Sequence, residues 1–106
     1  MKNNTYATTK SITQEEINAY KDAHSKILVN TSGLSKSDVK VSTIKEDGYL
    51  LIEIFSEKIC PFSGEPFYKL FYVNPEYKVI SAKQENGLLM IYIGNDTVNT
   101  KTVTVL

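Results

Sequence analysis

The chain has one cysteine and one histidine, the two side chains most often used as nucleophile, general base or metal ligand. His24 has no second base or metal ligand near it in the sequence, which is typical of a plain surface or core histidine. Cys60 stands before Pro61, and no histidine or basic cluster adjoins it to activate its thiol. The chain also has no glycine-rich phosphate loop, no metal-ligand spacing and no nucleophile motif. We therefore expect a protein that is not an enzyme and has no catalytic residue, cofactor or metal.

The charges of the chain are balanced, because 12 Lys and Arg residues stand against 12 Asp and Glu residues. Proteins that bind nucleic-acid backbones usually have a basic excess on the domain, so we expect no nucleic-acid partner. The length of 106 residues, with 42% hydrophobic residues, indicates one domain with its own core. A single cysteine permits no internal disulfide.

The first residues, Met1-Lys2-Asn3-Asn4-Thr5, are polar and do not lead into the apolar run of a signal peptide. No apolar stretch approaches the roughly 20 residues that a membrane-spanning helix needs. From these observations we expect a cytoplasmic protein that has no membrane partner.

A helix signal follows a polar segment, residues 1–12, which we interpret as a flexible arm. Thr13-Gln14-Glu15-Glu16 has the sequence of a capping box, in which the first and fourth residues bond to each other's backbone amides. The pattern predicts a short helix over residues 14–24, with Ile17, Tyr20 and His24 on one face. A helix of this length must pack on the rest of the domain to persist, so we interpret this face as a structural cap.

The remaining chain has the signals of short strands joined by tight turns. Asp47-Gly48 and Asn86-Gly87 are typical of two-residue hairpins, which need positive φ at both central residues. Two prolines and a glycine within residues 60–66 predict a loop. The predicted strands are residues 26–30, 39–44, 49–55, 67–73, 79–85, 88–93 and 101–106. Seven strands of this kind predict an all-β fold, an antiparallel β-sandwich.

Several segments resemble one known family, and they occur in the same order as in that family. Ala82, followed by Asn86-Gly87-Leu88-Leu89, resembles the Ala-x-x-x-Asn-Gly-Val-Leu signature of the small heat-shock proteins, whose conserved unit is the α-crystallin domain. Residues 35–41, 49–52 and 67–75 are similar to three other strand segments of that domain. The signature residues that match are Ala82, Gly87 and Leu89.

The resemblance covers residues 26–94 and implies an immunoglobulin-like β-sandwich. Residues 1–25 would then form an amino-terminal arm with a short helix, and residues 95–106 a carboxy-terminal extension. The interval from residue 56 to residue 66 is short compared with the segment that many family members exchange between dimer partners.

For function, the resemblance implies an ATP-independent holdase, a stress-response chaperone that binds unfolding proteins and prevents their aggregation. In the family, a carboxy-terminal Ile-x-Ile motif docks in a groove between two edge strands of a neighbouring domain. Val103 and Val105 form a Val-x-Val version of this motif. The residues that match the groove are Val39, Val41, Val79 and Ser81. Residues 103–105 are equally consistent with a last strand of their own sandwich.

Tyr68, Leu70 and Tyr72 form a second apolar face on one predicted strand, which is either interior packing or a subunit interface. Aromatic enrichment is typical of an interface, so we expect a dimer in which this edge strand pairs with its copy. The expected partners are therefore unfolded client proteins and further copies of the chain, in a homodimer or small oligomer.

A second functional hypothesis belongs to a different class of protein. The chain could be an α-crystallin-like binding module without general chaperone activity, such as an adaptor or virion accessory protein with one partner. The short polar arm favours this hypothesis, whereas the Val-x-Val tail favours the holdase.

Overall fold

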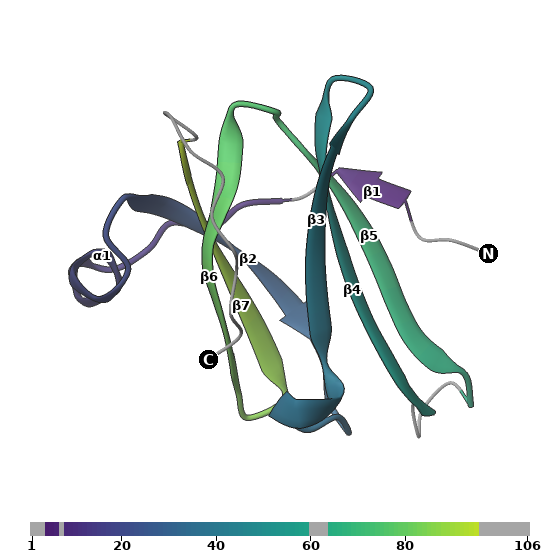
Figure 1. Cartoon of the computed structure of the whole chain (residues 1–106). Helices are drawn as coiled ribbons and strands as arrows, with labels where there is room; N and C mark the ends of the chain where they lie inside the picture. The colour runs from purple at the N-terminus through teal and green to yellow at the C-terminus, as the bar shows by residue number, and fades with distance from the viewer. Residues whose placement is uncertain (1–3, 7, 60–63, 96–106) are drawn as a thin grey trace.

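The computed structural model describes residues 4–6, 8–59 and 64–95 of the chain. These residues form seven strands, one α-helix and one turn of 3-10 helix (Figure 1). In chain order the elements are β1 Asn4–Tyr6, α1 Gln14–Ala19, β2 Ala23–Asn30, η1 Lys36–Asp38, β3 Lys40–Glu46, β4 Tyr49–Ile59, β5 Pro66–Val73, β6 Tyr77–Glu85 and β7 Leu88–Asn95.

The strands form two sheets, which lie on the two sides of the view in Figure 1. One sheet has the order β1-β5-β4-β3 and the other the order β2-β7-β6. All neighbours are antiparallel except β1, which pairs in parallel with β5. The predicted all-β class is therefore confirmed, and the predicted strands that lie within the described residues are all present.

One hydrophobic core joins the inner faces of both sheets, because side chains alternate along each strand. On β4, Leu50, Ile52 and Ile54 are buried while the residues between them are half-buried. On β7, the same alternation buries Leu89 and Ile91, together with Ile93. Burial of one such side chain contributes roughly 1.5–3 kcal/mol, so these central strands stabilise the fold most.

The two predicted hairpin turns are present and join strands that are neighbours in a sheet. Asp47 and Gly48 have φ of 50° and 77°, and Asn86 and Gly87 have φ of 53° and 78°. Positive φ at both central residues matches the twist of the flanking strands. The sequence therefore determines the β3–β4 and β6–β7 pairs through their turns.

The helix is shorter than the sequence pattern predicts. Its capping box is confirmed: the Glu16 amide donates to Thr13 Oγ1 at 3.2 Å, and the Thr13 amide donates to Glu16 Oε1 at 2.9 Å. The helix nevertheless ends at Ala19, and Asp22 takes a positive φ of 75° that turns the chain into β2. His24 consequently belongs to β2 and not to the helix, and its ring packs edge-on against Tyr77 at 4.9 Å. The prediction of a helix over residues 14–24 was therefore wrong beyond Ala19.

The polar arm differs from the flexible segment that we expected. β1 pairs with β5, and Lys10 forms an isolated bridge with Lys26 in the middle of β2. The amides of Lys10 and Lys26 each donate to the carbonyl oxygen of the other residue, at 2.8 and 3.0 Å. Backbone hydrogen bonds thus fix parts of the arm on both sheets, a result that side-chain composition does not predict.

No helix among the described residues is long and apolar enough to cross a membrane.

Candidate functional site

Among the described residues, those matched to the groove lie on or next to the last strands of two different sheets. β3 is the last strand of one sheet and β6 the last strand of the other, within the part of the chain that the structure describes (Figure 1). Val41 lies on β3 and Val39 directly precedes it, while Val79 and Ser81 lie on β6. The pairing of β6 with β7 shifts register between Val79 and Ser81, so the edge is irregular there. Such an irregularity bends an edge strand and leaves a residue outside the regular ladder.

The side chains of this group are more buried than an open groove would require. Val39 is 3% exposed, Val79 is 8% exposed and Ser81 is 9% exposed. Val39 and Val79 belong to the same hydrophobic core, and the half-buried Val41 packs against it. The structure therefore brings the valines of the two edges into one cluster. Contact with a partner there would depend on the backbone groups of the edge strands more than on these side chains.

Lysine side chains lie along both edge strands. Lys40 and Lys45 lie on β3, and Lys78 and Lys83 lie on β6. Charged side chains on an edge strand oppose indiscriminate pairing with other strands, because burying the charge beside a new strand is costly. This arrangement is compatible with reversible, selective binding of an extended segment.

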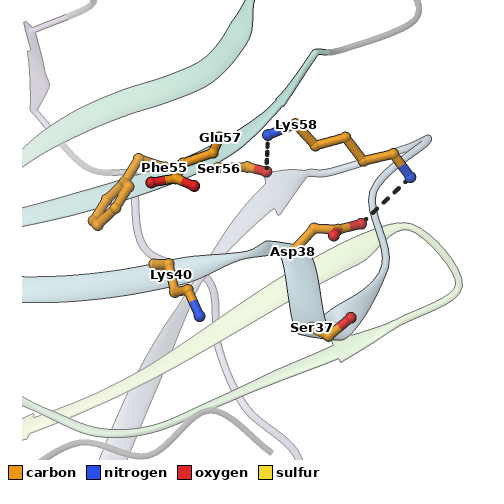
Figure 2. Close-up of a pocket in the computed structure, with 7 residues that line it drawn as sticks. All are labelled: Ser37, Asp38, Lys40, Phe55, Ser56, Glu57 and Lys58. Carbon is orange, nitrogen blue, oxygen red and sulfur yellow. Dashed lines mark hydrogen bonds and ion pairs between the residues drawn. The ribbon is translucent and has the colours of Figure 1, made fainter.

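A small polar cavity of about 270 Å³ lies where η1 leads into β3 (Figure 2). Asp38 accepts hydrogen bonds from the Ser35 amide at 3.1 Å and the Ser35 hydroxyl at 2.8 Å, and it forms an ion pair with Lys58 at 3.4 Å. The bonds from Ser35 lower the pKa of Asp38 below its usual value. The Asp38 carboxylate is thus used to close η1 and to hold Lys58 across the cavity. We did not identify this cavity from the sequence, although Ser35-Lys36-Ser37-Asp38 has capping-box spacing.

The three residues expected at a dimer contact, Tyr68, Leu70 and Tyr72, are half-buried on the outer face of β5. The Tyr68 hydroxyl donates to Glu53 Oε2 at 2.8 Å, and this bond raises the pKa of Tyr68. Tyr72 packs edge-on against Tyr49, with ring centroids 5.4 Å apart. All three residues lie on the outer side of the sheet, because they pair with the outward residues Phe55, Glu53 and Leu51 of β4.

The edge of β5 that faces away from β4 is paired in part with β1. Asn4, Thr5 and Tyr6 of β1 pair with Leu70, Phe71 and Tyr72. This arrangement differs from the pairing between copies that we expected for this edge, because the chain's own strand takes those positions.

The signature residues have structural positions in the β6–β7 hairpin. Ala82 and Leu89 are completely buried. Gly87 combines its positive φ with a close neighbour, since a Cβ atom there would lie 3.3 Å from Ser32 Oγ. The Gly87 carbonyl oxygen also accepts from the Thr31 amide at 2.8 Å. The hairpin tip is therefore held against the end of β2.

Sequence reasoning missed a polar cluster on the outer face of the β2-β7-β6 sheet. Glu16 accepts hydrogen bonds from the Tyr92 hydroxyl at 2.6 Å and from Lys26 Nζ at 2.9 and 3.1 Å, and the Tyr20 ring stacks on the Tyr92 ring at 4.1 Å. The bond from Tyr92, followed by the Thr13 amide, lowers the pKa of Glu16 to about 2. Burial and the same bond raise the pKa of Tyr92. The cluster attaches α1 to the sheet, and only the capping-box glutamate pointed to it in the sequence.

Val103 and Val105, which form the expected tail motif, lie outside the described residues. Within the described residues, no group of three or more His, Cys, Asp and Glu residues is placed to hold a metal ion. The fold and the two edges thus define an all-β domain with two edge strands as its candidate site.

Comparisons with protein-family models, with curated proteins and with solved structures each found no match to this chain.

Proposed function

We propose that this chain is an ATP-independent holdase of the small heat-shock type, built on an immunoglobulin-like β-sandwich. Its binding site would be the pair of edge strands β3 and β6. The proposal rests on one observation about β3 and β6, the two strands that match the groove walls in the family resemblance. They are edge strands of different sheets, and their valines lie in one shared core.

The proposed mechanism is addition of an extended segment to a strand edge. An unfolding protein exposes backbone amides and carbonyls that can pair with those of an edge strand. Binding the unfolded form, but not the native form, lowers the concentration of the species that aggregates. The register shift between Val79 and Ser81 favours weak and reversible pairing, because it interrupts a regular ladder.

The alternative is an adaptor or virion accessory module that binds one partner. The burial of Val39, Val79 and Ser81 favours it, because general capture of unfolded chains needs exposed apolar surface. In that case the edges would pair with one defined segment, and the protein would not protect unrelated clients.

Light scattering of reduced insulin, whose B chain precipitates, separates these two functions. The holdase should suppress the scattering when it is present in several-fold molar excess. An undiminished scattering curve would reject the holdase and favour the single-partner module.

A variant of β3 and a control variant outside it test whether the edge is the site. Val41→Lys places a charge beside the proposed segment and should reduce suppression of insulin precipitation. Ala19→Lys is the control, since Ala19 is an exposed residue of α1 outside both edge strands, and it should retain suppression. Thermal unfolding of both variants establishes that they are folded, and equal suppression by two folded variants would argue against the β3 edge.

A further inference from the structure

The outer face of the sheet formed by β3, β4 and β5 is unusually apolar for a surface. An antiparallel sheet with one solvated face normally has polar residues at its outward positions. The outward positions of β4 are instead Tyr49, Leu51, Glu53 and Phe55, all half-buried. On β3, the outward Ile44 is 52% exposed.

Cross-strand pairing arranges these side chains in rows. Leu51 lies between Ile44 of β3 and Tyr72 of β5. Phe55 lies between Lys40 and Tyr68 in the same way. The row between them is Ser42, Glu53 and Leu70, so the face combines aliphatic and aromatic groups with one polar strip across the three strands. Aromatic enrichment of this kind is typical of a protein interface.

The acidic group in the middle of this face, Glu53, already has hydrogen-bond donors. Glu53 accepts from the Tyr68 hydroxyl at 2.8 Å and from the Ser42 hydroxyl at 3.3 Å. A polar group that keeps its hydrogen bonds is much less costly to bury than one that loses them. These bonds offset part of the cost of covering the Glu53 carboxylate, and the apolar groups of the face must supply the rest.

Two exposed charges of opposite sign mark the ends of the face on β3. Lys40 begins the strand and Glu46 ends it, and both side chains point outward with Ser42 and Ile44. At about 3.3 Å per residue, their Cα atoms are about 20 Å apart.

We propose that a second copy of this chain stacks on this face, with the two sheets related by a two-fold axis that runs across the strands. Such an axis places each strand over its own copy in the reverse direction. Lys40 then lies over Glu46 of the second copy, and Phe55 lies over Tyr49 of the second copy. The charges at the two ends of β3 make the face complementary to itself, which is what an isologous dimer requires.

The occupied edge of β5 supports stacking over edge pairing as the dimer contact. β1 covers that edge along Leu70, Phe71 and Tyr72, whereas Ile44 remains more than half exposed on the face. The proposal thus assigns the half-buried Tyr68, Leu70 and Tyr72 to a face-to-face contact. It does not depend on the holdase activity, because the contact uses the outward side chains of β3, β4 and β5 and leaves the backbone edges of β3 and β6 unpaired.

Sedimentation velocity over a concentration series tests the apolar part of the contact. The wild-type chain should dimerise, and Ile44→Glu should raise the dimer dissociation constant by at least about tenfold, because it replaces an exposed apolar side chain of the contact by a charge. Leu28→Glu is the matched control, since Leu28 is 38% exposed on the other sheet, and it should dimerise like the wild type. A wild type that stays monomeric throughout, or an Ile44→Glu variant that dimerises normally, would overturn the proposal.

A charge exchange tests the two-fold arrangement. Lys40→Glu and Glu46→Lys should each weaken the dimer several-fold, because each places like charges opposite each other. The double variant restores opposite charges across the contact and should recover most of the wild-type affinity. Within one chain these positions lie farther apart than the Debye length of about 8 Å at physiological salt, so recovery must come from the contact between copies. A double variant that is weaker than both single variants would reject this arrangement.

Discussion

Glu16 has the most contacts of any polar side chain described above, and they connect three segments of the chain. Its carboxylate accepts hydrogen bonds from Thr13, Lys26 and Tyr92. The Lys26 and Glu16 side chains are only 18% and 16% exposed, so solvent screens this pair less than a surface ion pair. The short helix α1, which has no buried residue of its own, therefore depends on this carboxylate.

We predict that Glu16→Gln lowers the free energy of unfolding at pH 7 by about 1–2 kcal/mol, since bonds to a charged acceptor are lost. The pKa of Glu16 is held at about 2, below its ordinary value of 4.5. Its stabilising contribution is therefore complete above pH 4.5 and is lost as the pH falls through 2. Urea unfolding at several pH values should show the difference between wild type and variant shrinking over this range. Glu15→Gln, an exposed residue of the same turn, is the control, and a pH-independent difference would contradict the prediction.

The sequence predicted one half of this cluster and missed the other. The Thr13–Glu16 box is local, so its spacing alone identifies it. Tyr92 is 76 residues away along the chain from Glu16, and only the packing of α1 on β7 brings them together. Contacts of this kind depend on how elements are placed, which side-chain periodicity does not determine.

At the scale of elements, the turn before β2 crosses the end of β7. At this crossing, β7 needs a residue without a side chain. Gly94 faces Asp22, and a Cβ atom at Gly94 would overlap the Asp22 carbonyl oxygen. That oxygen belongs to the backbone of a tight turn with positive φ, so it cannot move aside easily.

We predict that Gly94→Ala lowers the free energy of unfolding by about 2–3 kcal/mol, because the backbone of the turn must shift. Gly48→Ala is the comparison, since a Cβ atom there meets nothing within 4 Å and only the positive φ of 77° opposes it. The expected cost at Gly48 is about 1 kcal/mol. Chemical unfolding of both variants gives the two values, and a Gly94→Ala variant as stable as Gly48→Ala would contradict the proposed overlap.

Most element positions were predictable, and the exceptions have physical reasons. The alternation of Leu50, Ile52 and Ile54 identified an inner face, as did that of Leu89, Ile91 and Ile93. β1 was not predictable, because a three-residue parallel pairing is made by backbone groups and leaves no hydrophobic pattern. The edges β3 and β6 were expected from the family resemblance, whereas the depth of burial of Val39 and Val79 depends on the packing of both sheets.

At the scale of the whole molecule, the Val-x-Val segment is expected to hold copies together. Val103→Ala with Val105→Ala should reduce the size of any assembly larger than a dimer. Two buried valines contribute on the order of 3–5 kcal/mol before ordering costs, which is enough for a weak contact. Native mass spectrometry measures the assembly, and Val98→Ala in the same extension is the control. An unchanged distribution of oligomers would remove the docking role from this segment.

The central claim is that partner segments bind at the β3 and β6 edges, and hydrogen exchange in the presence of reduced insulin tests it most directly. The account predicts slower amide exchange in Lys40–Glu46 and Tyr77–Glu85 when insulin is present, while the central strands β4 and β7 are unchanged. Exchange that is unaltered in both edge strands while insulin is kept soluble would contradict it.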